Sequence, residues 1–236
     1  MGRAFEYRKD RKMKRWSQMA KVFTKIGREI ALAVKEGGPE PSANPRLRLA
    51  IQNGKLANMP KVNVENAIKR AISKDAEDLI EMVYEGFGPH GIAFLIETLT
   101  DNPTRTVAAM RLYLNRSGGA LGTSGSVAFM FDRVGEFVFE LGNRNIDDIE
   151  LDLIDGGAEE IEMGEDNTVY VYTAFDGFGA MQGKLEELGI EVKEASLQRF
   201  PQVTKEITDA QKEDIEKLID KFEDDDDVQK VFHNMS

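Results

Sequence analysis

The spacing of apolar residues changes at about residue 75, which indicates that the chain combines two kinds of secondary structure. Before this point apolar side chains recur every three or four residues, the period of one face of an α-helix. The clearest such stripe comprises Trp16, Met19, Phe23, Ile26, Ile30 and Ala33. It predicts a helix over residues 14–35 that stops at Gly37-Gly38-Pro39, because glycine and proline oppose its continuation.

Two further helices are predicted in the same region. The first begins after Asn44, whose side chain can cap it, has Pro45 at its first position and runs to about Ala57. The second covers residues 64–72, with Asn63 as its cap. Three short helices predict a small helical bundle over residues 1–75.

Beyond residue 79 strands and helices alternate. Strands are predicted at 79–84, 92–99, 126–131, 136–140, 159–163, 168–174, 190–198 and 228–232, with Gly135 in a hairpin turn, and helices at 103–115, 146–154, 178–188 and 209–222. This order favours two split β-α-β units, and hence two α+β domains with antiparallel sheets. The expected fold is α+β and multidomain. The domains are expected at 1–75 (basic helical bundle), 79–140 plus 205–236, and 141–204 (an inserted acidic domain).

The charge of the chain also changes sign near residue 75. Residues 1–74 contain 18 Lys and Arg against 6 Asp and Glu, a net charge of +12, whereas the remaining 162 residues contain 13 against 36, a net charge of −23. Lys14, Lys21, Arg28 and Lys35 lie seven apart, on the helix side opposite the apolar stripe. A helix face that is merely exposed to solvent normally carries both positive and negative charges. Cations at this density repel one another unless a polyanion binds. The pattern favours a nucleic-acid surface over an anionic membrane surface or a plain charged face.

The cations expected to contact phosphates lie in the N-terminal arm, on the first helix and near the second. They are Arg3, Arg8, Lys9, Arg11, Lys12, Lys14, Arg15, Lys21, Lys25, Arg28, Arg46, Arg48 and Lys55. Phosphate contacts carry no sequence information, and only Asn58 and Gln52 are candidates for reading base edges. The partners expected are DNA or ribosomal RNA, with ribosomal or transcription proteins on the acidic domains.

The residue types available argue against an enzyme. The chain has no cysteine and only two histidines, His90 and His233, so no disulfide, thiol nucleophile, transition-metal site or cofactor is expected. The carboxylates of Glu85, Glu97 and Asp101 are scattered over predicted strands and turns. The longest apolar runs, such as residues 92–96, have five residues, far below the roughly 20 needed to cross a bilayer. No secretion signal follows the start, so a cytoplasmic protein is expected.

Four local motifs have both a functional and a structural interpretation. They are Gly86-x-Gly88-x-x-Gly91, the glycine-rich stretch 118–125, the acidic run 223–227, and the alternating Val127, Phe129 and Phe131. The first two lack the following helix of a nucleotide-binding loop, so we expect a tight turn and a helix cap, although N–H groups of the second could contact an anion. The acidic run lacks the spacing of a calcium loop and is expected to be solvated. The alternating residues are expected to form the buried face of a strand.

Six short motifs occur in a fixed order along the chain. They are Phe23-Thr24-Lys25-Ile26, Asn44-Pro45-Arg46-Leu47-Arg48, Ala57-Asn58-Met59-Pro60 with Asn63 and Ala67-Ile68, Tyr84-Glu85-Gly86-Phe87-Gly88-Pro89, Thr100-Asp101-Asn102 with Arg105-Thr106-Val107, and Leu121-Gly122-Thr123-Ser124-Gly125-Ser126-Val127. Together they resemble the YebC family, which also includes a mitochondrial translational activator of cytochrome c oxidase subunit I. The opening, Met1 to Arg8, departs from the His-Ser-Lys-Trp that is usual in that family.

The resemblance implies a cytoplasmic protein of three domains without catalytic activity, in which the acidic domains enclose a cleft for a protein or nucleic acid. Members are generally described as probable transcriptional regulators that bind DNA, and others act in translation. The expected function is therefore that of a non-enzymatic, DNA-binding transcriptional regulator. The alternative is a translation factor or translational activator that associates with the ribosome or ribosomal RNA.

Overall fold

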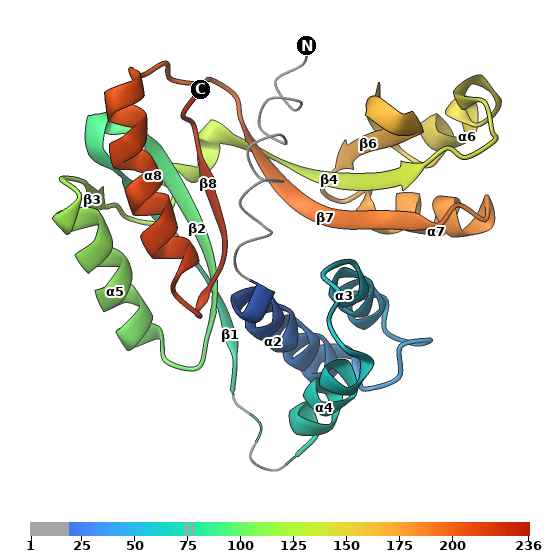
Figure 1. Ribbon diagram of the computed structural model, residues 1–236, viewed down its shortest axis with the longest axis horizontal. Helices are drawn as coiled ribbons and strands as arrows, with labels where there is room; N and C mark the ends of the chain where they lie inside the picture. Colours follow the sequence, from blue (N-terminus) through green and yellow to red (C-terminus); the bar gives the residue numbers. More distant parts are fainter. Residues whose placement is uncertain (1–18, 74–75, 77) are drawn as a thin grey trace. The chain divides into compact units, whose positions relative to one another are not determined.

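The computed structural model describes residues 19–73, 76 and 78–236 (Figure 1). These residues divide into two compact units. The first holds the described residues up to Phe131 together with Pro201–Ser236, and the second holds Asp132–Phe200. In the described part of the chain, no helix is both long enough and apolar enough to cross a bilayer.

The first unit begins with three helices, α2 (Met19–Gly37), α3 (Pro45–Leu56) and α4 (Lys61–Ala71). Their core is built by the predicted apolar stripe of α2, which includes Ile26 and Ile30, with residues of α3 and α4. Asn44 fixes the connection between α2 and α3. Its Oδ1 accepts from the Leu47 N–H at 3.0 Å, and its Nδ2 donates to the Ala33 and Gly38 carbonyls at 2.7 and 2.9 Å. One buried side chain thus caps the start of α3 and the end of α2.

The third helix begins earlier than predicted. It starts at Lys61, directly after Pro60, and Asn63 lies inside its first turn instead of capping it. Proline is favourable here because the N–H groups at the start of a helix have no acceptor within the helix, so the missing N–H of Pro60 costs no hydrogen bond. The expected start of the first helix, at residue 14, lies outside the described residues.

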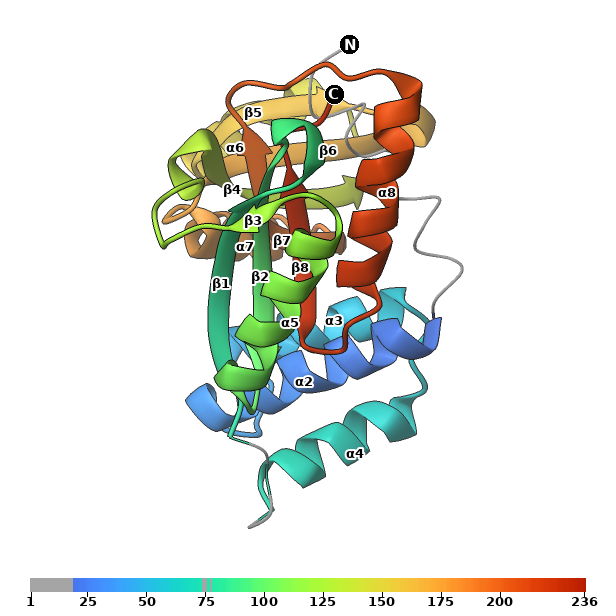
Figure 2. The same cartoon turned by 90° about the vertical axis from the view of Figure 1, so that its left-hand side faces the viewer.

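A four-stranded sheet forms the rest of the first unit, in the order β3-β1-β2-β8. Its elements are β1 (Ile80–Phe87), β2 (Ala93–Thr100), α5 (Pro103–Arg116), β3 (Ala120–Leu121), α8 (Asp209–Glu223) and β8 (Val228–His233), with 3₁₀ turns at Pro89–Gly91 and Ala128–Met130. Helices α5 and α8 cover one face of the sheet (Figures 1 and 2). Phe94 of β2 packs there against Phe222 of α8, with ring centroids 5.8 Å apart.

The second unit has its own sheet, in the order β5-β6-β4-β7. Its elements are β4 (Phe131–Glu140), α6 (Glu150–Asp155), β5 (Ala158–Met163), β6 (Thr168–Ala174), α7 (Phe178–Glu187) and β7 (Val192–Pro201), with 3₁₀ turns at Ile146–Asp148 and Glu165–Asn167. Phe137 of β4 stacks on Phe178 of α7 at 4.6 Å between centroids. Both units pair neighbouring strands antiparallel, which confirms the α+β multidomain class.

The strand over residues 131–140 corrects two expectations. Gly135 is not in a hairpin turn but in the middle of β4, and β4 pairs with β6. The residues up to 140 were expected in the first α+β domain, whereas this pairing places the strand in the second sheet. The glycine is needed for close packing, since a Cβ there would lie 2.5 Å from Thr173 Oγ1 and 2.8 Å from a ring carbon of Phe178.

Candidate nucleic-acid interface

The polar face of α2 lies against the acidic turn (residues 223–227), which connects α8 to β8 (Figure 2). Lys21 Nζ is 2.5 Å from Asp224 Oδ1, and Lys25 Nζ donates to the Glu223 carbonyl at 3.1 Å. That carbonyl belongs to the last residue of α8, where the helix dipole favours a cation. Burial lowers the pKa of Lys25 below its ordinary value, although the carboxylates of the turn raise it.

Arg28, one turn further along α2, reaches deeper into the same turn. Its Nη1 donates to the Asp226 carbonyl at 2.7 Å, to the Asp227 carboxylate at 2.7 Å and to the Leu99 carbonyl at 3.1 Å. A guanidinium with several acceptors of this kind is fixed in one orientation. Arg28 therefore joins α2 to the end of β2 and to the acidic turn.

Asp227 is the centre of a buried polar cluster. The residue is 4% exposed, and its carboxylate accepts from Arg28, from Arg105 Nη2 at 2.8 and 3.1 Å, from Thr106 Oγ1 at 2.8 Å and from Thr100 Oγ1 at 3.1 Å. Burial alone would raise the pKa of Asp227, but the hydrogen bonds from Arg105, Arg28 and Thr106 outweigh it and lower the pKa to about 2. The carboxylate is therefore ionised at every physiological pH.

This cluster corrects the expectation that the acidic run 223–227 is simply solvated. Asp227 is buried, and Asp225 accepts from Tyr113 Oη at 3.1 Å and from the Asp227 N–H at 2.9 Å. Only part of the run faces solvent, including Asp224 and Asp226. Within the described residues, no group of three or more histidines or carboxylates is arranged to hold a metal ion.

The remaining predicted cations of the described residues have different surroundings. Arg46 is paired with Glu36 at 2.7 Å and with Glu81, and Arg48 donates to two carbonyls of the α2–α3 connection at 3.0 Å each. Lys55, at the end of α3, is exposed. The sequence therefore identified cations of two kinds, some that brace the fold and some that face solvent.

Exposed cations also occur on α4, which contributes none of the cations predicted to contact phosphates. Lys69 and Arg70 occupy the last turn of α4 and are exposed. Together with Lys55 they make no ion pair with any residue that the structure describes. The signal that could have found them is the charge count of residues 1–74, in which they were included but not singled out.

Seven of the predicted cations lie outside the described residues. They are Arg3, Arg8, Lys9, Arg11, Lys12, Lys14 and Arg15. Their part in an interface stays a prediction.

The glycine-rich stretch does contact an anion, but the anion belongs to the protein. The Glu85 side chain, in a residue only 5% exposed, accepts from the N–H groups of Gly125 at 2.7 Å, Val127 at 2.6 Å and Ala128 at 2.7 Å. Charge-assisted hydrogen bonds of this length are strong. Glu85 therefore holds the loop after β3 in place. Asp101 is likewise paired, with Arg105 at 2.7 Å.

Residues 127–131 were expected to form a strand with one buried aromatic face, and this was wrong. Ala128–Met130 is a 3₁₀ turn, so Val127 and Phe131 are buried while Phe129 is 70% exposed. The hydrogen bonds that the successive N–H groups of Val127 and Ala128 donate to the Glu85 carboxylate hold the chain in this turn. The alternation of apolar residues therefore does not reflect a pleated strand.

The turn between β1 and β2 is structural, as its sequence context suggested. His90 has a positive φ of 60°, and its carbonyl accepts from Lys205 Nζ at 2.7 Å. Its ring nitrogens face Asp214 at 3.2 Å and Gln211 at 3.3 Å, both on α8. No local pattern around His90 indicates these partners, because they lie more than 120 residues away along the chain.

Of the two candidates for base reading, Asn58 has a role in the fold. It follows α3 with a left-handed backbone, φ 58°, and its N–H donates to the Lys55 carbonyl at 2.9 Å. Asparagine tolerates this conformation better than most residues. Its backbone conformation is thus explained by the helix end, and base reading by Asn58 and Gln52 stays a prediction.

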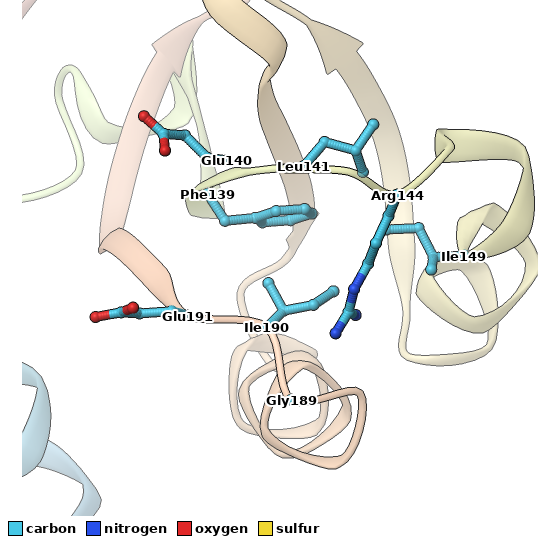
Figure 3. A pocket seen from close by; sticks show the side chains of 8 residues that line it. All are labelled: Phe139, Glu140, Leu141, Arg144, Ile149, Gly189, Ile190 and Glu191. Carbon is cyan, nitrogen blue, oxygen red and sulfur yellow. The ribbon is translucent and has the colours of Figure 1, made fainter.

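The second unit contains a small hollow at the ends of β4 and α7 (Figure 3). It measures about 80 Å³ and is lined by Phe139, Glu140, Leu141, Arg144, Ile149, Gly189, Ile190 and Glu191. Arg144 Nη1 donates to the Leu188 carbonyl at 2.9 Å. The hollow is well below the several hundred Å³ of a typical cofactor or substrate pocket.

The chain is an α+β multidomain protein. A helical domain is followed by two units that each combine an antiparallel sheet with helices, and β8 completes the first sheet. Residues 3–74 match the TACO1/YebC protein N-terminal domain, and residues 79–235 match the TACO1/YebC second and third domain. The chain therefore belongs to the TACO1/YebC family, as the motifs indicated.

Relatives are named for regulation of transcription. A "probable transcriptional regulatory protein" of Flavobacterium johnsoniae is 55% identical over 235 residues, covering 100% of this chain and 99% of that one. One of the same name from Parabacteroides distasonis is 56% identical, covering 100% and 97%. The crystal structure of the conserved hypothetical protein Aq1575 from Aquifex aeolicus is similar with a TM-score of 0.78 at 35% identity, covering 93% of this chain and 91% of that one.

Proposed function

We propose that this chain is a non-enzymatic regulatory protein that binds nucleic acid through its N-terminal helical domain. The observation that carries the proposal is the charge of residues 1–74, where 18 Lys and Arg stand against 6 Asp and Glu. Lys55, Lys69 and Arg70 are exposed cations of this domain that make no ion pair in the described part of the chain. Cations of this kind bind phosphates and release the counterions that surround a polyanion.

Duplex DNA is the first candidate target. It agrees with the names of the relatives, which are probable transcriptional regulatory proteins. The arm cations Arg3 to Arg15, with Lys55, Lys69 and Arg70, would contact the phosphates. If about six phosphates are neutralised, the logarithm of the affinity falls with the logarithm of the salt concentration with a slope of about −5.

Ribosomal RNA is the second candidate, and one observation favours it. The helical domain offers many cations for phosphates but only Asn58 and Gln52 as candidates for base contacts, which a promoter-specific protein requires. Folded RNA can instead be recognised by its shape and backbone. The same cations would then bind the ribosome.

The two targets are separated by a competition experiment. Labelled protein is incubated at near-physiological salt with 70S ribosomes and duplex DNA together, and the bound fractions are compared. The test variant is Lys55→Glu/Lys69→Glu/Arg70→Glu. The matched control is Arg111→Glu/Arg116→Glu/Lys217→Glu, which changes the net charge equally on exposed residues outside the helical domain.

Each result has a definite meaning. If DNA retains the protein and only the test variant loses it, the DNA-binding proposal is supported. If ribosomes retain it, with the same dependence on the test variant, the translation role is supported. If both variants bind as the unaltered protein does, or lose binding equally, Lys55, Lys69 and Arg70 are not part of the interface.

A further inference from the structure

Lys21 and Lys25 of α2 are held by an anionic segment of the same chain. Lys21 Nζ is 2.5 Å from Asp224 Oδ1, and Lys25 Nζ is 3.1 Å from the Glu223 carbonyl. Five acidic residues follow one another in the acidic turn, so several negative charges lie along one stretch of backbone. This arrangement resembles the successive phosphates of a nucleic acid in its charge.

A phosphate oxygen and Asp224 Oδ1 cannot occupy the same position next to Lys21 Nζ. A phosphate can therefore take this position only if the acidic turn releases the lysine. We infer that the acidic turn competes with nucleic acid for Lys21 and Lys25 and so lowers the affinity of the helical domain. This inference rests on the proposed function, since it concerns the regulation of the same cations.

The turn has an anchored part and a displaceable part. Asp227 is buried among Arg28, Arg105 and two threonines, and Asp225 accepts a hydrogen bond from Tyr113. By contrast, the Asp224 side chain is 54% exposed and Asp226 is also exposed. The anchored residues keep the turn beside α2, while the exposed carboxylates can exchange with phosphates without opening the buried cluster.

The competition is expected to be modest. An exposed ion pair changes an equilibrium by about two- to fivefold, because water and salt screen it. Removing the carboxylates of Asp224 and Asp226 should therefore strengthen nucleic-acid binding by roughly three- to tenfold. A change of this size lowers the affinity for polyanions that make few contacts, whereas a target that makes many contacts still binds.

The test compares two variants of the full chain that gain the same charge. Asp224→Asn/Asp226→Asn removes the displaceable carboxylates, and Glu213→Gln/Glu216→Gln removes two exposed carboxylates two to three turns earlier on α8. Affinity for a short fluorescein-labelled duplex DNA and for a labelled ribosomal RNA fragment is measured by fluorescence anisotropy. Thermal unfolding of each variant verifies that the fold is retained.

The inference predicts tighter binding for Asp224→Asn/Asp226→Asn alone, and loss of that gain when Lys21→Gln and Lys25→Gln are added. Equal gains in both charge-matched variants would show a general effect of net charge and overturn it. Unchanged affinity, with the unaltered protein still binding, would overturn the inference while the proposed function stands. If no form of the protein binds either probe, the proposed function fails, and the inference fails with it.

Discussion

Replacing Asp227 by asparagine tests whether the buried cluster between α2, α5 and the acidic turn holds the first unit together. The substitution keeps the shape of the side chain but removes its charge and turns one acceptor into a donor. Arg28, Arg105 and Thr106 then face a group that can accept from only some of them. Two guanidinium groups lose their common counter-charge, that of Arg28 at a largely buried side chain and that of Arg105 at a half-exposed one.

The size of the effect follows from the pKa. Lowering the pKa of Asp227 from 3.8 to about 2 corresponds to roughly 2.5 kcal/mol of stability at neutral pH. Leaving charged donors with incomplete partners in a buried site adds to this cost. We therefore expect Asp227→Asn to lower the free energy of unfolding by about 2–4 kcal/mol.

Urea unfolding followed by circular dichroism measures this difference, fitted separately if the two units unfold in separate steps. The contribution of a carboxylate with a lowered pKa is fully present above its unfolded-state value and is lost as the pH falls. For Asp227 the loss begins near pH 4 and is complete below about pH 2. At pH 3 the difference between the protein and its variant should be smaller by about 1 kcal/mol than at pH 7.

Asp226→Asn is the matched control, because it removes the neighbouring carboxylate, which is exposed. It should change the free energy of unfolding by less than about 0.5 kcal/mol. A loss of that small size for Asp227→Asn, or a difference that is the same at pH 3 and pH 7, would refute the electrostatic account of the cluster.

Three further substitutions test other parts of the fold. Glu85→Gln should cost about 1–3 kcal/mol, because an amide can accept fewer of the three loop N–H groups; faster hydrogen exchange at Gly125, Val127 and Ala128 would reveal it, and unchanged protection would contradict it. Asn44→Ala should cost about 1–2 kcal/mol in thermal unfolding through loss of both helix caps, whereas Asn44→Asp should retain the α3 cap. Gly135→Ala should cost about 1–3 kcal/mol through the 2.5 Å approach to Thr173, and a neutral effect would show that the strand can move.

The helical domain could be predicted because its signals are local. The apolar stripe of α2, the glycines after it and the Asn44-Pro45 pair each act within one or two turns of helix, and the structure has α2 ending at Gly37 and α3 beginning at Pro45. The predicted start of α4 is too late because asparagine is a common capping residue, which favoured Asn63. Pro60 already provides a favourable start.

The errors in the α+β part come from contacts that the sequence does not display. Glycine is common in turns, but position 135 requires a glycine because Thr173 and Phe178 leave no room for a side chain there. Residues 127–131 alternate like a strand, but the Glu85 carboxylate, about 40 residues away, folds them into a 3₁₀ turn. Pattern analysis assigns such segments by their composition alone.

The same limit applies to the candidate interface. The helical period placed Lys21, Lys25 and Arg28 along one polar face, and this needed only local information. Their acidic partners are about 200 residues away along the chain. Sequence reasoning could compare the total charges of the two regions, but it could not identify which carboxylates would lie beside which cations.

The return of the last strand to the first sheet has a consequence for synthesis. β8 pairs with β2, and Phe222 of α8 packs on Phe94, yet about 130 residues separate these partners in the order of translation. The second unit, whose strands all lie between Phe131 and Pro201, is complete before α8 has been made. A nascent chain can therefore finish its inserted unit while the first sheet still lacks an edge strand and one covering helix. Emergence of α8 and β8, and not emergence of the elements before them, should therefore be the moment at which the first sheet acquires its full core.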